Sequence, residues 1–159
     1  MDKYYKNIKQ LIETNLVEVK KNEISSNYHT LITYYNVGKE LIEAQGGEKR
    51  AKYGNTLIKD YSTKLTKEFG KGYDYTNLFR MRQLYLCFEK VGAMRQQLNP
   101  KNQIASSQIS FLNISWTHYR ILLPIKNESK RNYYINSTIE NNFSSRNLIK
   151  YIKTNAYEY

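Results

Sequence analysis

The residue pair closest to a catalytic pattern is Glu18 and Lys20, in Val17-Glu18-Val19-Lys20. In metal-dependent nucleases an acid at this spacing binds the metal, and the lysine stabilises charge at the scissile phosphate. That chemistry also needs a second acid on a neighbouring strand. The apolar residues around this pair instead recur with a helical period, and Asp2 is the only aspartate upstream. We therefore interpret the pair as a solvated helix face and predict no catalytic residue.

Other residue types that could do chemistry are few. The histidines, His29 and His118, have no cysteine or carboxylate around them at metal-ligand spacing, so we predict no metal site. Cys87 is the only cysteine and stands in the apolar run LYLCF, where it reads as a small buried hydrophobe. The glycine stretch GKGYDY is too short for a phosphate loop and lacks its final Lys-Ser/Thr pair. We predict no cofactor.

The charge balance points to a binding role with an anionic partner. Lys and Arg number 25 against 14 acidic residues, which gives a net charge of +11 over 159 residues. Such a balance favours polyanions through phosphate neutralisation and counterion release, but charge alone leaves DNA, RNA and anionic membranes open. The sequence has no apolar run of roughly 20 residues and its first residues do not resemble a signal peptide, so we expect no membrane association and a cytoplasmic location.

Apolar periodicity predicts an all-α fold with at most one minor short strand, arranged as a single domain over residues 1–159. Residues 1–46 read as a helical hairpin that stops at Gly46-Gly47. Residues 47–88 read as a helix-turn-helix-like unit, with helices from about 55 to 69 and from about 76 to 88, separated by Gly70 and Gly72. Asp74 or Thr76 can cap the second of these helices.

The residues after position 88 differ from the preceding ones in composition and in apolar periodicity. Residues 89–114 have no sustained period and are rich in Asn, Gln and Ser, so we predict a long loop there, with a short strand at 109–112 as an option. Residues 115–159 predict three helices, beginning near Trp116, Asn127 and Ser144 or Ser145, and a second helix-turn-helix is conceivable among them. The chain has 16 tyrosines, which we assign mainly to the core.

The candidate nucleic-acid contacts lie on two of these helices. In a helix-turn-helix the second helix enters the major groove, and Arg, Asn and Gln have the geometry to hydrogen-bond base edges. The candidates are Lys71, Thr76, Asn77, Arg80 and Gln83 around the first glycine turn, and Ser145, Arg146 and Lys150 on the last helix. Arg82 lies about 200° around the helix from Arg80, at the border of the apolar stripe, so it is the better candidate for a structural role.

A weak internal sequence similarity links the two sets of candidate contacts. Asn77-Leu78 and Asn147-Leu148 both follow a turn with an aromatic residue and a hydroxyl or acid cap, and both open a mixed basic and apolar helix. Two related helix-turn-helix units in one chain and a chance match both fit this pattern.

Several motifs together resemble one bacterial family. They are Tyr34–Gln45 (YYNVGKELIEAQ), Tyr53-Gly54, the FGKG turn Phe69–Gly72 followed by Asn77-Leu78 and Met81-Arg82, the block Ser115-Trp116-x-His118-Tyr119, and the closing Phe143-Ser144-x-Arg146-x-Leu148. In this order they are similar to the N-terminal domain of YhcG-type proteins, a domain of unknown function that precedes a PD-(D/E)XK nuclease domain. The resemblance covers most of the chain.

The resemblance implies a link to DNA cleavage or to defence against foreign DNA, with the chemistry outside these residues. In the family the nuclease half would follow the last helix, whereas this sequence ends at TNAYEY. A domain cut from a longer chain and a short member without the nuclease are both open. We predict a non-catalytic module that binds duplex DNA and targets a nuclease. The alternative is a module for dimerisation or protein interaction, without direct contact to nucleic acid.

Overall fold

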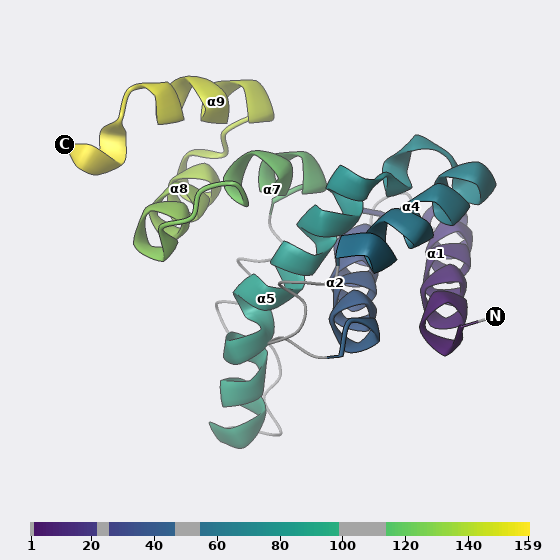
Figure 1. The fold of residues 1–159 in the computed structure, drawn as a ribbon. Coiled ribbons are helices and arrows are strands. Elements are labelled where there is room, and N and C mark those ends of the chain that lie inside the picture. Colours follow the sequence, from purple (N-terminus) through teal and green to yellow (C-terminus); the bar gives the residue numbers. More distant parts are fainter. Residues whose placement is uncertain (1, 22–25, 47–54, 99–113) are drawn as a thin grey trace. The chain divides into compact units, whose positions relative to one another are not determined.

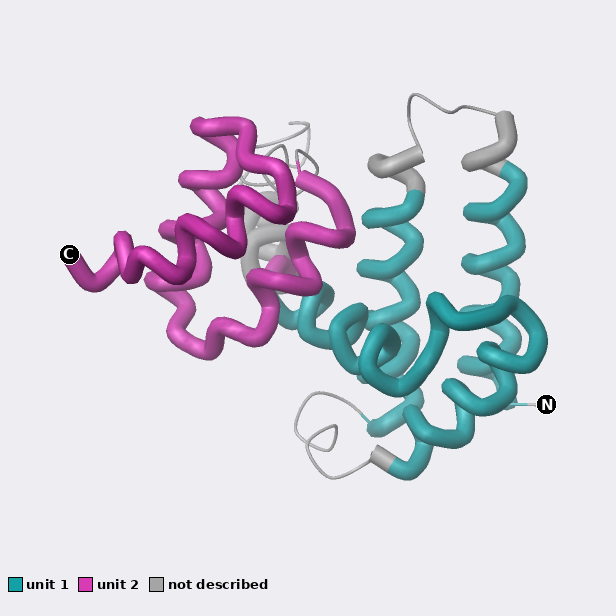
Figure 2. Tube along the Cα trace, turned by 90° about the horizontal axis from the view of Figure 1, so that it is seen from above, with its two compact units in different colours: residues 1–87 teal, residues 88–159 magenta. Residues whose placement is uncertain are grey.

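The structure is a computed structural model that describes residues 2–21, 26–46, 55–98 and 114–159. Within these residues the fold is all-α, as the periodicity predicted, with seven α-helices and two short 3-10 turns (Figure 1). The chain forms two compact units, Met1–Cys87 and Phe88–Tyr159, each described by itself below (Figure 2). The boundary between them falls inside one long helix. No helix of the described residues is long and apolar enough to cross a membrane.

Unit 1 is built on the predicted helical hairpin. Helix α1 (Lys3–Lys21) and helix α2 (Ser26–Ala44) lie side by side (Figure 2). The apolar positions of α1 recur at three- and four-residue steps, so Tyr5, Ile8 and Ile12 share one buried face. From α2, Leu31 and Leu41 join the same core and are fully buried. The hairpin follows from this burial rather than from helix propensity alone.

Helix α4 (Asn55–Phe69) packs across the start of α1 and matches the predicted range. The Tyr61 hydroxyl donates a hydrogen bond to the Asp2 carboxylate, which holds the pKa of Asp2 below its usual value. Near the C-terminal end of α4, Glu68 accepts a hydrogen bond from the Tyr5 hydroxyl at 3.4 Å and pairs with the Lys9 ammonium at 2.7 Å. Polar contacts from the middle and from the C-terminal end of α4 therefore attach it to the first part of α1.

A glycine turn connects α4 to the next helix, as predicted. Gly70 has φ 97°, a left-handed conformation that side chains with a Cβ rarely adopt, and it leads into the 3-10 turn η2 (Lys71–Tyr73). Helix α5 (Tyr75–Leu98) then begins after Asp74, whose carboxylate accepts the backbone N–H of Asn77 at 2.9 Å. Of the two capping residues that the sequence offered, Asp74 and Thr76, the structure selects Asp74.

The predicted loop at 89–114 is wrong in its first ten residues, because α5 continues to Leu98. Residues 89–98 (EKVGAMRQQL) lack an apolar period but consist largely of strong helix formers, and the single glycine costs only about 1 kcal/mol relative to alanine. Propensity therefore extends the helix where periodicity gives no signal. The remaining loop residues and the optional strand at 109–112 lie outside the described residues.

Helices α2 and α5 approach each other closely at Gly38. A Cβ added at Gly38 would overlap the Met81 carbonyl oxygen and would lie 2.8 Å from the Met81 carbonyl carbon and 3.0 Å from the Tyr85 Cβ. These neighbours are largely backbone, so they have little freedom to move aside. The glycine of the YYNVGKEL motif is therefore a packing requirement between the two helices.

Unit 2 contains helices α7 (Trp116–Leu122), α8 (Glu128–Asn141) and α9 (Ser145–Lys153), followed by the 3-10 turn η3 (Ala156–Glu158). Side chains cap the three helices at Ser115, Asn127 and Ser144. Three residues, 142–144, connect α8 to α9, and Asn142 takes the left-handed conformation (φ 50°) that ends α8.

The small core of unit 2 is mainly aromatic and aliphatic. Tyr119, Leu122, Tyr134 and Leu148 are fully buried, which supports the assignment of tyrosines to the core. The hydroxyls of Tyr133 and Tyr151 lie 2.9 Å apart, and the Tyr134 hydroxyl accepts the backbone N–H of Tyr157 at 3.3 Å. Tyrosine here fills the core with its ring while its hydroxyl binds the neighbouring segment.

We expect Gly38→Ala to lower the free energy of unfolding by about 1 to 3 kcal/mol, since the added methyl group overpacks the α2–α5 contact. Chemical denaturation followed by circular dichroism measures the change. Gly72→Ala is the matched control, because a Cβ at Gly72 meets nothing within 4 Å. Equal stability of the two variants would contradict the assigned role of Gly38.

Candidate nucleic-acid interface

The first predicted contact set lies around the start of α5. Leu78, Met81 and Leu84 of α5 are fully buried and fix which side of the helix faces the core. Of the predicted contacts, Lys71 and Thr76 are exposed, whereas Asn77, Arg80 and Gln83 are half-buried. The structure therefore places these five residues on one short segment but does not present them equally to solvent.

Arg80 and Gln83 are engaged with each other. The Arg80 Nη1 donates a hydrogen bond of 2.6 Å to the Gln83 Oε1, and the guanidinium lies 5.7 Å from the centre of the Phe79 ring. Both side chains are of the type that reads base edges, but each already satisfies part of the other's hydrogen bonding. Arg80 would have to release Gln83 before it could make a bidentate contact with a base.

Asn77 has a role in the protein itself. Its backbone N–H donates to Asp74 in the first turn of α5. The side-chain Oδ1 is buried and has no hydrogen-bond partner in the structure. A half-buried amide with a covered oxygen is poorly placed to read adenine, which needs both the oxygen and the nitrogen at the surface.

Arg82 is buried in unit 1 and is 8 % exposed. Its Nη1 donates to the Gln45 Oε1 at 2.9 Å, and its guanidinium lies 4.7 Å from the centre of the Phe79 ring. Burial lowers the pKa of this guanidinium. Arg82 thus connects α5 to the residue that follows α2, which agrees with the structural role expected from its position on the helix.

The second predicted contact set lies on α9 and is more exposed. Arg146 and Lys150 are exposed, and Ser145 is half-buried in the first turn. Lys153, which the sequence analysis did not select, is also exposed and follows at the next helical step. The three cations share one face of α9, while Leu148 on the opposite side is fully buried. We call Arg146, Lys150 and Lys153 the α9 basic face.

No described acidic residue forms an ion pair with the α9 basic face, and α9 itself contains no Asp or Glu. By contrast, Lys130 of α8 pairs with Glu158 at 2.6 Å. The charge of the α9 basic face is therefore available to an external anion. The signal in the sequence is the spacing of four and then three residues between these cations, which places all three on one side of a helix.

His118 connects two of the sequence motifs within unit 2. Its Nε2 lies 2.8 Å from the Phe143 carbonyl oxygen, to which it donates, and its Nδ1 accepts the Ser115 backbone N–H at 3.1 Å. These contacts require the neutral tautomer with the proton on Nε2. The imidazole therefore attaches the start of α7 to the turn before α9 and has a structural role.

The sequence similarity between the starts of α5 and α9 reflects a shared capping pattern. The backbone N–H of Asn147 is bound by the Ser144 side chain, as that of Asn77 is by Asp74, and the leucine after each asparagine is fully buried. This pattern is common at helix starts, so it leaves the duplication open.

The candidate catalytic pair lies on a helix, as its apolar period predicted. Glu18 and Lys20 lie on α1, and their side chains are outside what the structure describes. Among the described residues, no three His, Cys, Asp or Glu side chains gather closely enough to hold a metal ion.

Comparison with known proteins then places the chain. Residues 7–159 match the family described as the DUF1016 N-terminal domain. The chain belongs to this family. It is also 32 % identical over 163 aligned positions to the Escherichia coli (strain K12) protein named "Putative nuclease YhcG". That match covers 91 % of this chain but 44 % of the relative, so the chain spans less than half of the relative's length. No solved structure matches the chain.

The family assignment agrees with the motifs that carried the resemblance, and the structure assigns positions to them. Gly38 lies at the α2–α5 contact, Arg82 is buried beside Gln45, and His118 binds the Phe143 carbonyl. These motif residues therefore maintain the fold. Of the predicted contacts, Lys71, Thr76, Arg146 and Lys150 are exposed.

We expect His118→Leu to destabilise unit 2 by about 2 kcal/mol, because it leaves the Ser115 N–H and the Phe143 carbonyl without this partner. Thermal unfolding followed by the fluorescence of Trp116, the only tryptophan, measures the effect. Thr117→Ala, at an exposed neighbouring position, is the control. Unchanged melting of the His118 variant would contradict the proposed attachment.

Proposed function

We propose that this chain is a non-catalytic DNA-binding module that targets a nuclease, and that α9 makes its principal contact with the phosphate backbone of duplex DNA. The observation that carries the proposal is the α9 basic face: three exposed cations on one side of a helix, without an ion-pair partner among the described residues. Such a face can neutralise phosphates and release their counterions.

The connectivity around α9 supports this assignment. Helix α8, the three residues 142–144 and helix α9 follow one another in the order of a helix-turn-helix, in which the second helix enters the major groove. Ser145 and Arg146 occupy the first turn of α9, where such helices meet the DNA. The net charge of +11 adds a sequence-independent attraction to any duplex.

The link to a nuclease comes from the relatives. The similar Escherichia coli protein carries the name "Putative nuclease YhcG". The sequence resemblance further implies that in YhcG-type proteins a PD-(D/E)XK nuclease domain follows this domain. A module that holds DNA beside such a domain would raise the local concentration of its substrate. We infer that the role of this chain in DNA cleavage, or in defence against foreign DNA, is to provide that contact in the cytoplasm.

The segment at the start of α5 is a second candidate contact. Lys71 and Thr76 are exposed there, and Arg80 can reach an external acceptor once it releases Gln83. Because that exchange costs a hydrogen bond, we assign this segment a smaller share of the affinity than the α9 basic face.

We expect the triple substitution Arg146→Ala, Lys150→Ala and Lys153→Ala to weaken binding to duplex DNA and to flatten its salt dependence. Each lost phosphate contact should reduce the slope of log K against log salt by about 0.9. Fluorescence anisotropy with a labelled duplex at several salt concentrations measures both quantities. The control removes the same charge from exposed positions of unit 1, by Lys3→Ala, Lys6→Ala and Lys59→Ala. Equal slopes for the two triple variants would refute the proposal.

For the second candidate contact, we expect Arg80→Ala to weaken binding by about 1 kcal/mol, at the low end for one lost contact with DNA. Gln83→Ala should leave the affinity unchanged or raise it slightly, because it releases the Arg80 guanidinium. The same anisotropy titration compares the two variants. A similar loss in both would show that Arg80 and Gln83 contact DNA together, whereas no loss in either would remove α5 from the interface.

A further inference from the structure

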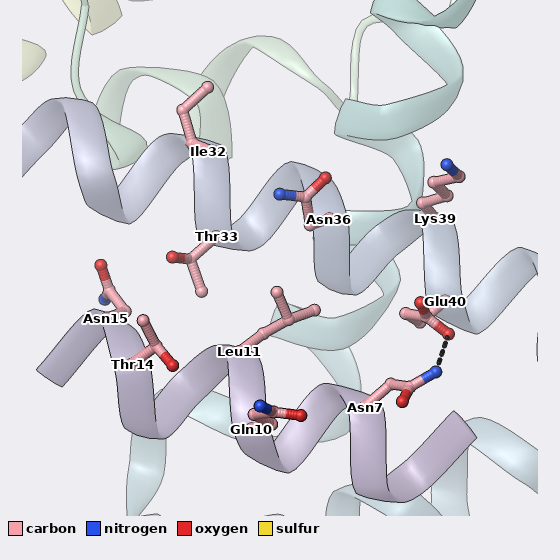
Figure 3. A pocket seen from close by; sticks show the side chains of 10 residues that line it. All are labelled: Asn7, Gln10, Leu11, Thr14, Asn15, Ile32, Thr33, Asn36, Lys39 and Glu40. Carbon is pink, nitrogen blue, oxygen red and sulfur yellow. Dashed lines mark hydrogen bonds between the residues drawn. The ribbon is translucent and has the colours of Figure 1, made fainter. Parts of the chain in front are cut away.

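A polar groove runs between α1 and α2 on the surface of unit 1 (Figure 3). Its volume is about 610 Å³, and its walls include Asn7, Leu11 and Asn15 from α1 with Ile32, Asn36 and Glu40 from α2. We call this the α1–α2 groove. None of the predicted DNA contacts lines this groove, whereas Asn36, Lys39 and Glu40 of the motif Tyr34–Gln45 do.

The α1 wall of the groove carries a regular row. Asn7, Leu11 and Asn15 follow one another at four-residue steps, so they lie on one face of α1, as Figure 3 shows. The row spans about 12 Å along the helix axis, with an amide at each end and an aliphatic side chain in the middle. Reversing its direction leaves this order of groups unchanged.

Asn15 marks the groove as incomplete. It is 6 % exposed, and its Oδ1 has no hydrogen-bond partner in the structure. A buried acceptor without a partner costs about 1 to 3 kcal/mol. Rotation about the Cβ–Cγ bond exchanges the positions of the amide oxygen and nitrogen, so the oxygen can turn toward a donor that enters the groove.

A matching donor stands at the other end of the row. The Asn7 Nδ2 donates to the Glu40 carboxylate at 3.2 Å, and its second N–H remains for another acceptor. Within one copy Asn7 and Asn15 are two helical turns apart and cannot meet. In a second copy running in the opposite direction, each would face the other.

We propose that two copies of this chain associate across the α1–α2 groove, with their α1 helices antiparallel and related by a two-fold axis near Leu11. Asn7 of one copy then binds the partner's Asn15, and the same pair forms again on the other side of the axis. Leu11 packs against the partner's Leu11, and each α1 covers the groove of the other copy. This is an isologous interface, in which one patch meets itself.

The charge distribution favours a second copy over a polyanion in this groove. The chain carries +11 overall, so most of its surface repels another copy. The walls of the groove contain Lys39 and Glu40 as their charged residues, and these cancel. Next to the groove on α1, Val17 is 51 % exposed and adds apolar surface at the edge of the contact. The groove is thus a neutral surface where two basic chains can approach.

A charge placed at the rim of the groove tests the proposal. Thr14 lines the groove and is exposed, so Thr14→Arg should leave the monomer folded while it places two like charges in the symmetric contact. We expect the wild-type chain to be a dimer by light scattering, and the variant to raise the dimer dissociation constant at least tenfold. Thr66→Arg, at an exposed site on α4, is the matched control. A monomeric wild-type chain, or equal effects of both variants, would overturn the proposal.

Cross-linking tests the position of the axis. In a Cys87→Ala background, Leu11→Cys places a thiol next to the two-fold axis, where it should meet its copy and form a disulfide-linked dimer under mild oxidation. Thr66→Cys in the same background should remain largely monomeric. A dimer that Thr66→Cys traps as efficiently would refute the antiparallel α1 arrangement. Both experiments are done without DNA, so their failure would not bear on the role of the α9 basic face.

Discussion

The close approach of α2 and α5 is the constraint on which the rest of unit 1 depends. Without a side chain at Gly38, the backbone of α5 at Met81 lies directly against α2. This proximity places Arg82 beside Gln45, and it brings the rings of Tyr35 and Tyr85 to a centroid distance of 5.1 Å. Packing thus uses the side of α5 that carries Arg82, whereas Thr76 at the start of the helix is exposed.

The sequence predicted helices most accurately where glycine or a capping residue ends the apolar period. Helix α4 matched its predicted range because glycine at position 70 stops it, and α9 began where a serine caps it. The prediction failed at residues 89–98, where periodicity is silent and helix propensity decides. An apolar period shows that one face of a helix is buried. The lack of such a period therefore does not indicate whether the backbone of a segment is helical.

The prediction of the contact residues on α5 failed to anticipate their burial for a different reason. A helical wheel assigns Asn77, Arg80 and Gln83 to the face away from the core, but it contains no neighbouring side chains. In the structure Gln83 and the Phe79 ring engage Arg80, and the oxygen of Asn77 is covered. On the short helix α9, Arg146, Lys150 and Lys153 are exposed, as a helical wheel indicates for the side opposite Leu148. Exposure on a wheel is a reliable guide only where a helix packs on one side.

The α1–α2 groove is neutral and lies in unit 1, whereas the α9 basic face is positively charged and lies in unit 2, so the proposed association of copies and the proposed phosphate contact use separate surfaces. A two-fold pair would carry two α9 basic faces, whatever the placement of the units in each copy. Two linked contacts on one duplex raise the effective concentration of the second contact and add their salt dependences. A two-fold protein also matches the two-fold symmetry of a palindromic site. Simultaneous contact of both α9 basic faces with one duplex would therefore strengthen the proposed DNA contact without any additional base contact.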